Sequence, residues 1–279
     1  MTLIAQTRNE SRRDPASARK ARKILGRSAV VLLDWDGCVA LGDRPVEGAI
    51  AFLSEWPGRA AIVSNNSTHL PEDFATILAR AGVEMALDRI VLAGVEAIER
   101  AREIGADRVL MLGDSRMKAH ARRRGLNLVS DGADLVVLLR DRRFSYAKLE
   151  RAASCLRTGA RLVVSNPDLT HPGAAGRIAP ETGALRAALL ACLADIDIAG
   201  EVIGKPGPRL FDHACRALGA PRESAVMIGD NPATDIAGAE ALGLESILIG
   251  PQSGLRFEDL LRQPAAPGLR LAKAGASHT

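Results

Sequence analysis

The 279-residue chain has few aromatic residues, few cysteines and no long apolar run, and each shortage excludes a class of protein. Phe, Trp and Tyr make up 3% of the sequence, too few for a platform that stacks single-stranded nucleic acid. The four cysteines include no Cys-x-x-Cys pair, which argues against a zinc site or a disulfide framework. Runs such as Leu135–Leu139 fall well short of the roughly 20 residues of a membrane span. We therefore expect a cytoplasmic protein that binds neither nucleic acid nor a membrane.

Positive charge is concentrated at the start of the chain. Residues 1–27 carry eight Lys and Arg and two acids, a net of +6, so the whole chain's +4 leaves −2 for the remainder. We predict a solvated basic tail or short helix there, because its acids argue against a targeting segment. Residues 263–279 are small, polar and rich in Pro and Gly, which predicts a second tail. The body between them is long enough to bury a core.

Short apolar runs alternate with amphipathic segments along this body. Ala29–Asp34 and Ala60–Ser64 have the composition of strands buried on both faces. Pro71 opens a helical pattern that Gly82 can end. The alternation continues and predicts an α/β fold with a parallel sheet. Further strands are predicted at Arg108–Leu112, Ala133–Leu139, Arg161–Ser165, Val202–Gly204, Ala225–Gly229 and Ser246–Ile249, and further helices at 95–104, 146–158, 184–194, 208–218 and 235–242.

Two acids follow the first buried strand directly, in the sequence Asp34-Trp35-Asp36-Gly37. Ligands of open parallel sheets bind outside the carboxyl ends of the strands, so these acids lie where chemistry is expected. Asp34 can attack a phosphorus centre and form an aspartyl-phosphate. Asp36 can protonate the leaving oxygen and later accept a proton from water. The alternative is a turn that carries two solvated acids.

A second acid pair follows another predicted strand, in the run Gly229–Asp235. Asp230 and Asp235, together with an acid from the first strand, can hold one Mg²⁺ through carboxylate oxygens. Asp235 can equally serve as a helix N-cap. The sequence therefore predicts a magnesium site. Asp230 indicates metal binding more specifically than Asp235 does.

Two polar motifs complete the set. Ser64 and Asn65 end the second strand and precede a helix, a position where hydroxyl, amide and backbone N–H groups can cradle an anion. Lys205 follows a short predicted strand and can neutralise phosphate charge. Alone, the first motif is also typical of a turn and the second of a surface lysine. Together with the acid pairs they indicate a phosphoryl site.

In these four motifs, and in their order along residues 28–262, the sequence resembles the haloacid dehalogenase superfamily. The resemblance implies a Rossmann-like parallel-sheet core, Mg²⁺ and hydrolysis of a phosphate ester. About 140 residues separate Ser64 from Lys205. An α/β cap inserted there is similar to the nitrophenylphosphatase-like and pyridoxal phosphatase-like branch, as are the stretches Val164–Asp168 and Pro180–Leu185.

The resemblance also implies roles for individual residues. Asp34 would be the nucleophile, and Asp36 the general acid and base with its backbone carbonyl on the metal. Asp230 would bind the metal directly, and Asp235 would hold metal-bound water or brace its loop. The phosphate-binding residues would be Ser64, Lys205 and Asn65, and the residues near the cap and substrate would be Asn166, Asp168 and His171.

We therefore predict a catalytic core at 28–82 plus 199–262, a cap at 83–198 and tails at 1–27 and 263–279. The predicted function is Mg²⁺-dependent hydrolysis of a small phosphorylated metabolite through an aspartyl-phosphate on Asp34. Two alternatives stay open: a phosphotransferase or phosphomutase acting on a sugar phosphate, and a non-catalytic phospho-ligand-binding protein. The resemblance further implies a homodimer paired through the cap.

Overall fold

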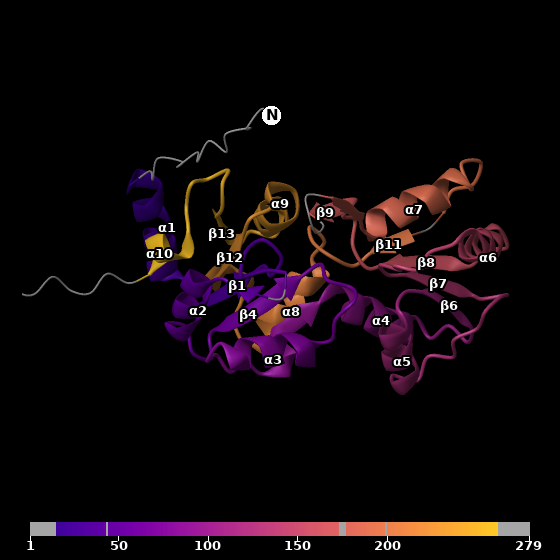
Figure 1. The fold of residues 1–279 in the computed structure, drawn as a ribbon, viewed down its shortest axis with the longest axis horizontal. Helices are drawn as coiled ribbons and strands as arrows, with labels where there is room; N and C mark the ends of the chain where they lie inside the picture. Colours follow the sequence, from indigo (N-terminus) through magenta and orange to yellow (C-terminus); the bar gives the residue numbers. More distant parts are fainter. Residues whose placement is uncertain (1–14, 43, 173–176, 199, 262–279) are drawn as a thin grey trace, which may run out of the picture.

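The computed structural model describes residues 15–42, 44–172, 177–198 and 200–261. They form two α/β parts, each built on a parallel sheet of its own (Figure 1). The core sheet has the strand order β13-β12-β1-β4-β5, and the cap sheet has the order β11-β8-β7-β6. This confirms the predicted parallel-sheet core with an inserted α/β cap.

The core sheet is centred on β1 (Val30–Leu33), which pairs in parallel with β4 (Ala60–Ser64) and β12 (Ala225–Gly229). The edges are β5 (Ile90–Leu92) and β13 (Glu245–Leu248). Every residue of β1 is buried, as expected for a parallel strand with helices on both faces. The carboxyl ends of these strands meet at one edge of the sheet, and that edge faces the cap.

Two helix layers cover the core sheet. One layer shares a buried apolar cluster with Val31 and Leu33, and the other shares a cluster with Val30 and Leu32. The first layer contains α1 (Pro15–Arg27), α2 (Glu47–Ser54), α3 (Pro71–Arg80) and α10 (Phe257–Leu260). The second contains α8 (Arg209–Ala217) and α9 (Ala237–Ala241).

The cap repeats this layered plan on a smaller sheet. Its strands are β6 (Val109–Leu112), β7 (Leu135–Leu138), β8 (Arg161–Val164) and β11 (Gly200–Val202). Alternate residues of β7 belong to different apolar clusters, so the sheet is covered on both faces. The helices of the cap are α4 (Ala93–Ile104), α5 (Ser115–Arg123), α6 (Tyr146–Arg157) and α7 (Thr182–Ala191).

Short elements fill the connections. Two antiparallel hairpins lie after the first core strand and within the cap. They are β2 (Ala40–Leu41) with β3 (Arg44–Pro45), and β9 (Thr170–Pro172) with β10 (Ile178–Pro180). Single helical turns form at η1 (Leu87–Arg89), η3 (Arg222–Ser224) and η4 (Pro232–Ile236).

The cap was predicted to begin at residue 83 and to end at residue 198, but the strand pairing places both of its boundaries later in the chain. β5 pairs with β4 and so belongs to the core sheet, which moves the start of the cap to about residue 93. β11 pairs with β8 and so belongs to the cap sheet, which moves the return to the core past Val202. Both strands have three residues, too few to show in the sequence which sheet they join.

The N-terminal segment contains the short helix that the sequence allowed, but this helix packs on the core and is not a solvated tail. Residues 15–27 form α1, which buries Ala18, Ala21, Ile24 and Leu25 against the core. These residues recur at helical spacing, so the basic side chains occupy the opposite face of an amphipathic helix. Residues 1–14 and the expected tail at 263–279 lie outside the described residues. Among the described helices, none has both the length and the apolar character that a membrane span requires.

Candidate active site

The predicted motifs converge at the edge of the core sheet that faces the cap. Asp34 follows β1, Ser64 ends β4, and Asp230 follows β12. Lys205 arrives differently, because the strand before it, β11, pairs in the cap sheet. The lysine therefore enters the core site from the junction between the two parts.

Lys205 lies at the centre of the site with its ammonium fully buried. Its Nζ lies 2.6 Å from Asp34 Oδ1 and 2.7 Å from Asp235 Oδ1, and it donates to the Val63 carbonyl at 2.7 Å. All three donors of the ammonium group thus have acceptors. Burial alone lowers the pKa of Lys205, but the two carboxylates outweigh this and hold it above its usual value. Lys205 is therefore a permanent positive charge beside Asp34.

Three carboxylates form a group that fits a metal ion. Asp34, Asp230 and Asp235 each offer one oxygen, and these oxygens lie within 4.8 Å of one another. Burial raises the pKa of both Asp34 and Asp230, and Asp235 raises each further by charge repulsion. Carboxylate oxygens in such a group are ligands suited to Mg²⁺, whose charge would offset the repulsion. The side chain of Asp36 stands outside this group.

Two glycines make room for these acids. A Cβ on Gly37 would collide with the carboxylate of Asp230, and a Cβ on Gly229 would collide with that of Asp235. Gly37 also has a φ of +90°, a backbone conformation that residues with a Cβ disfavour. The glycine in each acid motif thus lets a carboxylate approach the backbone closely.

Asp235 combines two roles. Its Oδ1 contacts Lys205, and its Oδ2 accepts a hydrogen bond from the backbone N–H of Asn231 at 3.1 Å. It lies inside the single turn η4, with its side chain buried. The N-cap interpretation falls to Asn231 instead, whose side chain accepts from the N–H of Ala233. Asp235 therefore braces its loop while facing the metal group.

Asn65 binds the lysine loop with its side chain. Its Oδ1 accepts from the backbone N–H of Lys205 at 2.8 Å, and its Nδ2 donates to the Lys205 carbonyl at 3.1 Å and to Asp168 at 3.0 Å. Gly204 permits this approach, because a Cβ there would meet Asn65 Oδ1. With its side chain engaged, Asn65 can offer an anion only its backbone N–H. The hydroxyl of the neighbouring Ser64 accepts from the N–H of Asn66 at 3.1 Å.

Asp36 is an exposed residue, and the ion pairs of Lys205 are made by Asp34 and Asp235 instead. Crowding by surrounding protein atoms raises its pKa, and a hydrogen bond from Asn66 and the charges of His69 and His171 oppose that rise. The carboxyl group can therefore exchange a proton with a leaving group or with water.

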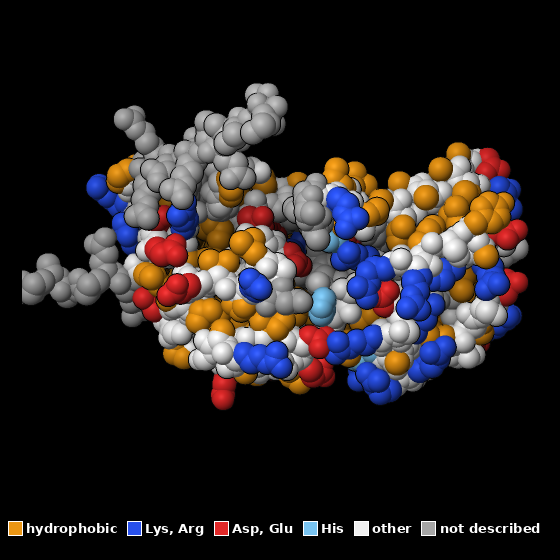
Figure 2. Space-filling model, in the orientation of Figure 1, with side chains coloured by type: hydrophobic (Ala, Val, Ile, Leu, Met, Phe, Trp, Pro, Cys, Tyr) orange, Lys and Arg blue, Asp and Glu red, His pale blue; other side chains and the backbone are white. Residues whose placement is uncertain are grey.

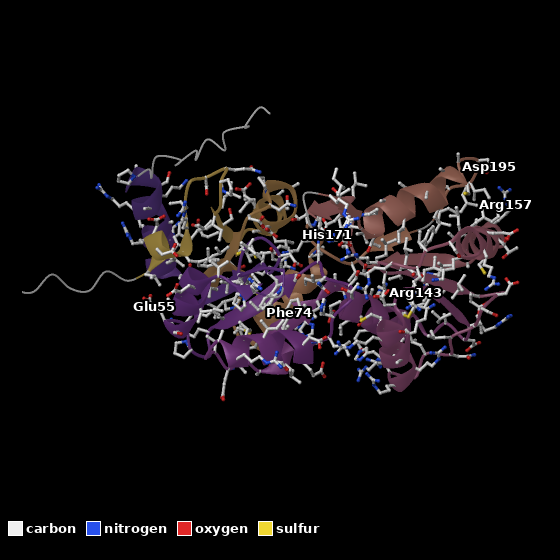
Figure 3. The ribbon with its side chains drawn as sticks, viewed as in Figure 1. Glu55, Phe74, Arg143, Arg157, His171 and Asp195 are labelled. Atoms are coloured by element: carbon white, nitrogen blue, oxygen red, sulfur yellow. The ribbon has the colours of Figure 1, made fainter. Side chains whose placement is uncertain are left out.

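The cap residues expected near the substrate divide into two sets. Asn166 donates to the Asn65 carbonyl at 2.8 Å, and Asp168 accepts from Asn65, so both tie the cap to the core. His171 lies on β9 at the edge of the cap that faces the core (Figure 3). Its Nδ1 is 2.7 Å from Glu181 Oε1.

Sequence reasoning missed two residues of this edge, Arg140 and Glu181. An Arg140 guanidinium nitrogen lies 3.2 Å from Glu181 Oε1, and another lies 3.3 Å from His171 Nε2. Burial raises the pKa of Glu181 to about 7, although Arg140 lowers it. The only signal in the sequence was that Glu181 falls within the stretch Pro180–Leu185. Nothing local marked Arg140.

Family models match two separate stretches of the chain, and individual relatives match most of it. A family model described as haloacid dehalogenase-like hydrolase matches residues 31–127, and a related HAD-hydrolase-like model matches residues 202–269. A dihydroxyacetone phosphatase of Corynebacterium glutamicum is 27% identical over 241 residues, which are 85% of this chain and 86% of the relative. The match to a phosphoserine phosphatase of Thermus thermophilus is 47% identical, but it covers 26% of this chain and only 28% of that relative.

Two solved structures share the fold of both parts. The p-nitrophenyl phosphatase of Archaeoglobus fulgidus has a TM-score of 0.72 at 26% identity and covers 79% of this chain and 85% of its own. The glycerol phosphate phosphatase of Mycobacterium tuberculosis, solved in complex with magnesium, has a TM-score of 0.70 at 30% identity. The match covers 80% of this chain and 68% of the phosphatase chain. The chain therefore belongs to the haloacid dehalogenase-like hydrolases, in the branch whose solved members include p-nitrophenyl phosphatases.

Proposed function

We propose that this protein hydrolyses a small phosphate monoester with Mg²⁺ through an aspartyl-phosphate on Asp34. The observation that carries the proposal is the position of Asp34, which lies in the metal-binding group and contacts Lys205. The names of the relatives support it, since they include phosphatases of dihydroxyacetone phosphate and glycerol phosphate. Lys and Arg side chains gathered on the cap near its boundary with the core would attract an anionic substrate (Figure 2).

In the first step, a carboxylate oxygen of Asp34 attacks the phosphorus atom. The ester P–O bond breaks, and the leaving alcohol oxygen takes a proton from Asp36. Lys205 holds the nucleophile in place and balances negative charge that develops on the phosphoryl oxygens. In the second step, Asp36 takes a proton from water, the water oxygen attacks phosphorus, and the bond to Asp34 breaks with release of phosphate.

Asp34, Asp230 and Asp235 would hold the metal ion, together with the backbone carbonyl of Asp36. When bound, Mg²⁺ supplies positive charge that offsets repulsion between a carboxylate and a phosphate dianion. The hydroxyl of Ser64 and the backbone N–H of Asn65 would bind the transferred phosphoryl group.

The direct test is phosphate release from a panel of small phosphomonoesters, with Mg²⁺ or with EDTA. We expect Mg²⁺-dependent release that Asp34→Asn abolishes and that Asp88→Asn, an exposed acid on η1, leaves intact. Release of phosphate in step with the alcohol, without transfer to added glycerol, separates hydrolysis from phosphoryl transfer. Absence of release from every ester by folded protein would contradict the proposal.

A second readout needs no turnover. Mg²⁺ at about 100 times its dissociation constant stabilises the folded state by about 2.7 kcal/mol, because it binds only that state. We therefore expect Mg²⁺ to raise the thermal midpoint of the wild type and to have little effect on Asp230→Asn, which loses one carboxylate ligand. An equal rise in both proteins would show that the metal binds elsewhere.

A further inference from the structure

Three cap side chains form a connected cluster beside Asp36. Arg140 follows β7, His171 lies on β9 and Glu181 precedes α7, so three separate segments supply them. Arg140 reaches Glu181 at 3.2 Å and His171 at 3.3 Å, and His171 reaches Glu181 at 2.7 Å. All three side chains are mostly shielded, with 22%, 34% and 15% of their surface exposed for Arg140, His171 and Glu181.

The cluster faces the core site. The backbone N–H of Arg140 donates to the hydroxyl of Ser67 in the loop after β4, at 3.1 Å. The charge of Asp36 raises the pKa of both His171 and Glu181, and the charge of His171 lowers the pKa of Asp36, so the cluster lies near that carboxyl group. Since Asp36 protonates the leaving oxygen in the proposed reaction, the rest of the leaving group extends toward these cap side chains.

The chemistry of the cluster suits hydroxyl groups. Arg140 offers hydrogen-bond donors and Glu181 offers acceptors side by side, and a hydroxyl both donates and accepts. When Glu181 is ionised, its negative charge cancels the positive charge of Arg140, and the pair then has no net charge. Asp36 and Asp168 stand nearby and add negative charge, which would repel a carboxylate on the leaving group.

The geometry points to a specificity subsite formed by Arg140 and Glu181, which binds the hydroxyls of an uncharged polyol leaving group and disfavours hydroxy acids. The assignment rests on the proposed function and names the substrate class for the same site. His171 lies beside both members, with its Nε2 3.3 Å from Arg140 and its Nδ1 2.7 Å from Glu181. With a pKa near 7, Glu181 can also present a protonated carboxyl to a hydroxyl oxygen.

The test compares two esters with the same three-carbon skeleton, glycerol 3-phosphate and 3-phosphoglycerate. We expect the wild type to have a kcat/KM for the polyol ester at least about tenfold higher. Glu181→Gln removes a negative charge and should lower this ratio about tenfold, which is about 1.4 kcal/mol. Arg140→Gln removes the cation that could pair with a carboxylate and should raise the ratio, with both effects carried mainly by KM.

Arg142→Gln is the matched control, because Arg142 is an exposed cap arginine that pairs with Asp114 and lies outside the cluster. It should leave the ratio unchanged. If Arg140→Gln does not fold, Arg140→Lys keeps the charge but loses the planar fork, and it should raise KM for glycerol 3-phosphate without raising the ratio.

Opposite shifts of more than twofold in the two Gln variants support the subsite. Shifts in the same direction, shifts below twofold, or a wild type that prefers 3-phosphoglycerate overturn it. A wild type that hydrolyses p-nitrophenyl phosphate but shows no such shifts refutes the subsite alone. A wild type that releases phosphate from no ester refutes the proposed function as well.

Discussion

Replacing Lys205 with Met removes a buried cation from between two carboxylates and keeps most of the side-chain volume. In the wild type, Nζ lies 2.6 Å from Asp34 and 2.7 Å from Asp235, with 1% of the side chain exposed. It also donates to the Val63 carbonyl at 2.7 Å. Met donates no hydrogen bond, so all three acceptors lose their partner while the carboxylates stay in place.

Removal of one partner from a buried ion pair costs about 3–5 kcal/mol, because the remaining charge is left uncompensated. Burial already raises the pKa of Asp34, so uptake of a proton relieves part of that cost. We expect Lys205→Met to lose about 3 kcal/mol of unfolding free energy at pH 7 without metal. The loss should shrink as the pH falls, because protonation of the carboxylates removes their repulsion.

Urea unfolding in EDTA, followed by tryptophan fluorescence, measures this loss. The chain has two tryptophans, and both Trp35 and Trp56 are buried in the core that contains Lys205. The double variant Lys205→Met/Asp235→Asn should recover about 1–3 kcal/mol, because it removes one of the unpaired charges. We also expect kcat/KM of the single variant to fall at least about 10²-fold.

Two results would refute this reasoning. One is a loss below about 1 kcal/mol at pH 7 with an unchanged denaturant slope, which would mean that Lys205 does not compensate buried charge. The other is a double variant no more stable than the single one, which would mean that Asp235 is not its partner.

Three further predictions concern other parts of the chain. Gly37→Ala should weaken Mg²⁺ binding at least about tenfold in a thermal-shift titration, because its Cβ would clash with a metal-binding carboxylate, whereas Gly82→Ala has a similar φ of +88° in open space and should keep the response. Burial raises the pKa of Glu181 to about 7 from 4.5, so the stabilising protonated form is lost as the pH rises through that range. The wild type should lose about 1–2 kcal/mol more than Glu181→Gln between pH 5 and pH 8 in urea titrations, and equal losses would contradict that pKa. In α1, Ile24→Ala should lower the unfolding free energy by about 2–4 kcal/mol and Lys23→Ala by less than about 0.5 kcal/mol; similar small losses would mean that the helix does not pack on the core.

The elements that the sequence predicts well are those with enough residues to show a period. The apolar runs at Val30–Leu33 and Ala60–Ser64 form strands of the core sheet, and Pro71 begins a helix that ends before Gly82. The three-residue strands β5 and β11 are harder to recognise from the sequence, because an apolar run of that length also occurs in loops and helices. Their misplacement explains why the predicted boundaries of the cap differ from those of the sheets.

Residues at strand ends were also predictable as a group. Parallel strands bring their carboxyl ends to one edge, so Asp34, Ser64 and Asp230 had to lie near one another once the strands were recognised. Which atoms touch was not predictable. Asn65 was expected to contact the phosphoryl group through its backbone or its side chain, and its side chain binds the backbone of Lys205 across 140 positions of sequence.

The sequence by itself determined the acids, the lysine and the glycines of the core site, because each stands in a local motif directly after a strand. Only the tertiary structure decided that Arg140 and Glu181 join His171 beside Asp36. Arg140, His171 and Glu181 are single polar residues on separate segments, and no periodic pattern links them. Their meeting depends on how the cap sheet and its hairpin pack against the core, which is fixed by long-range contacts that local sequence does not record.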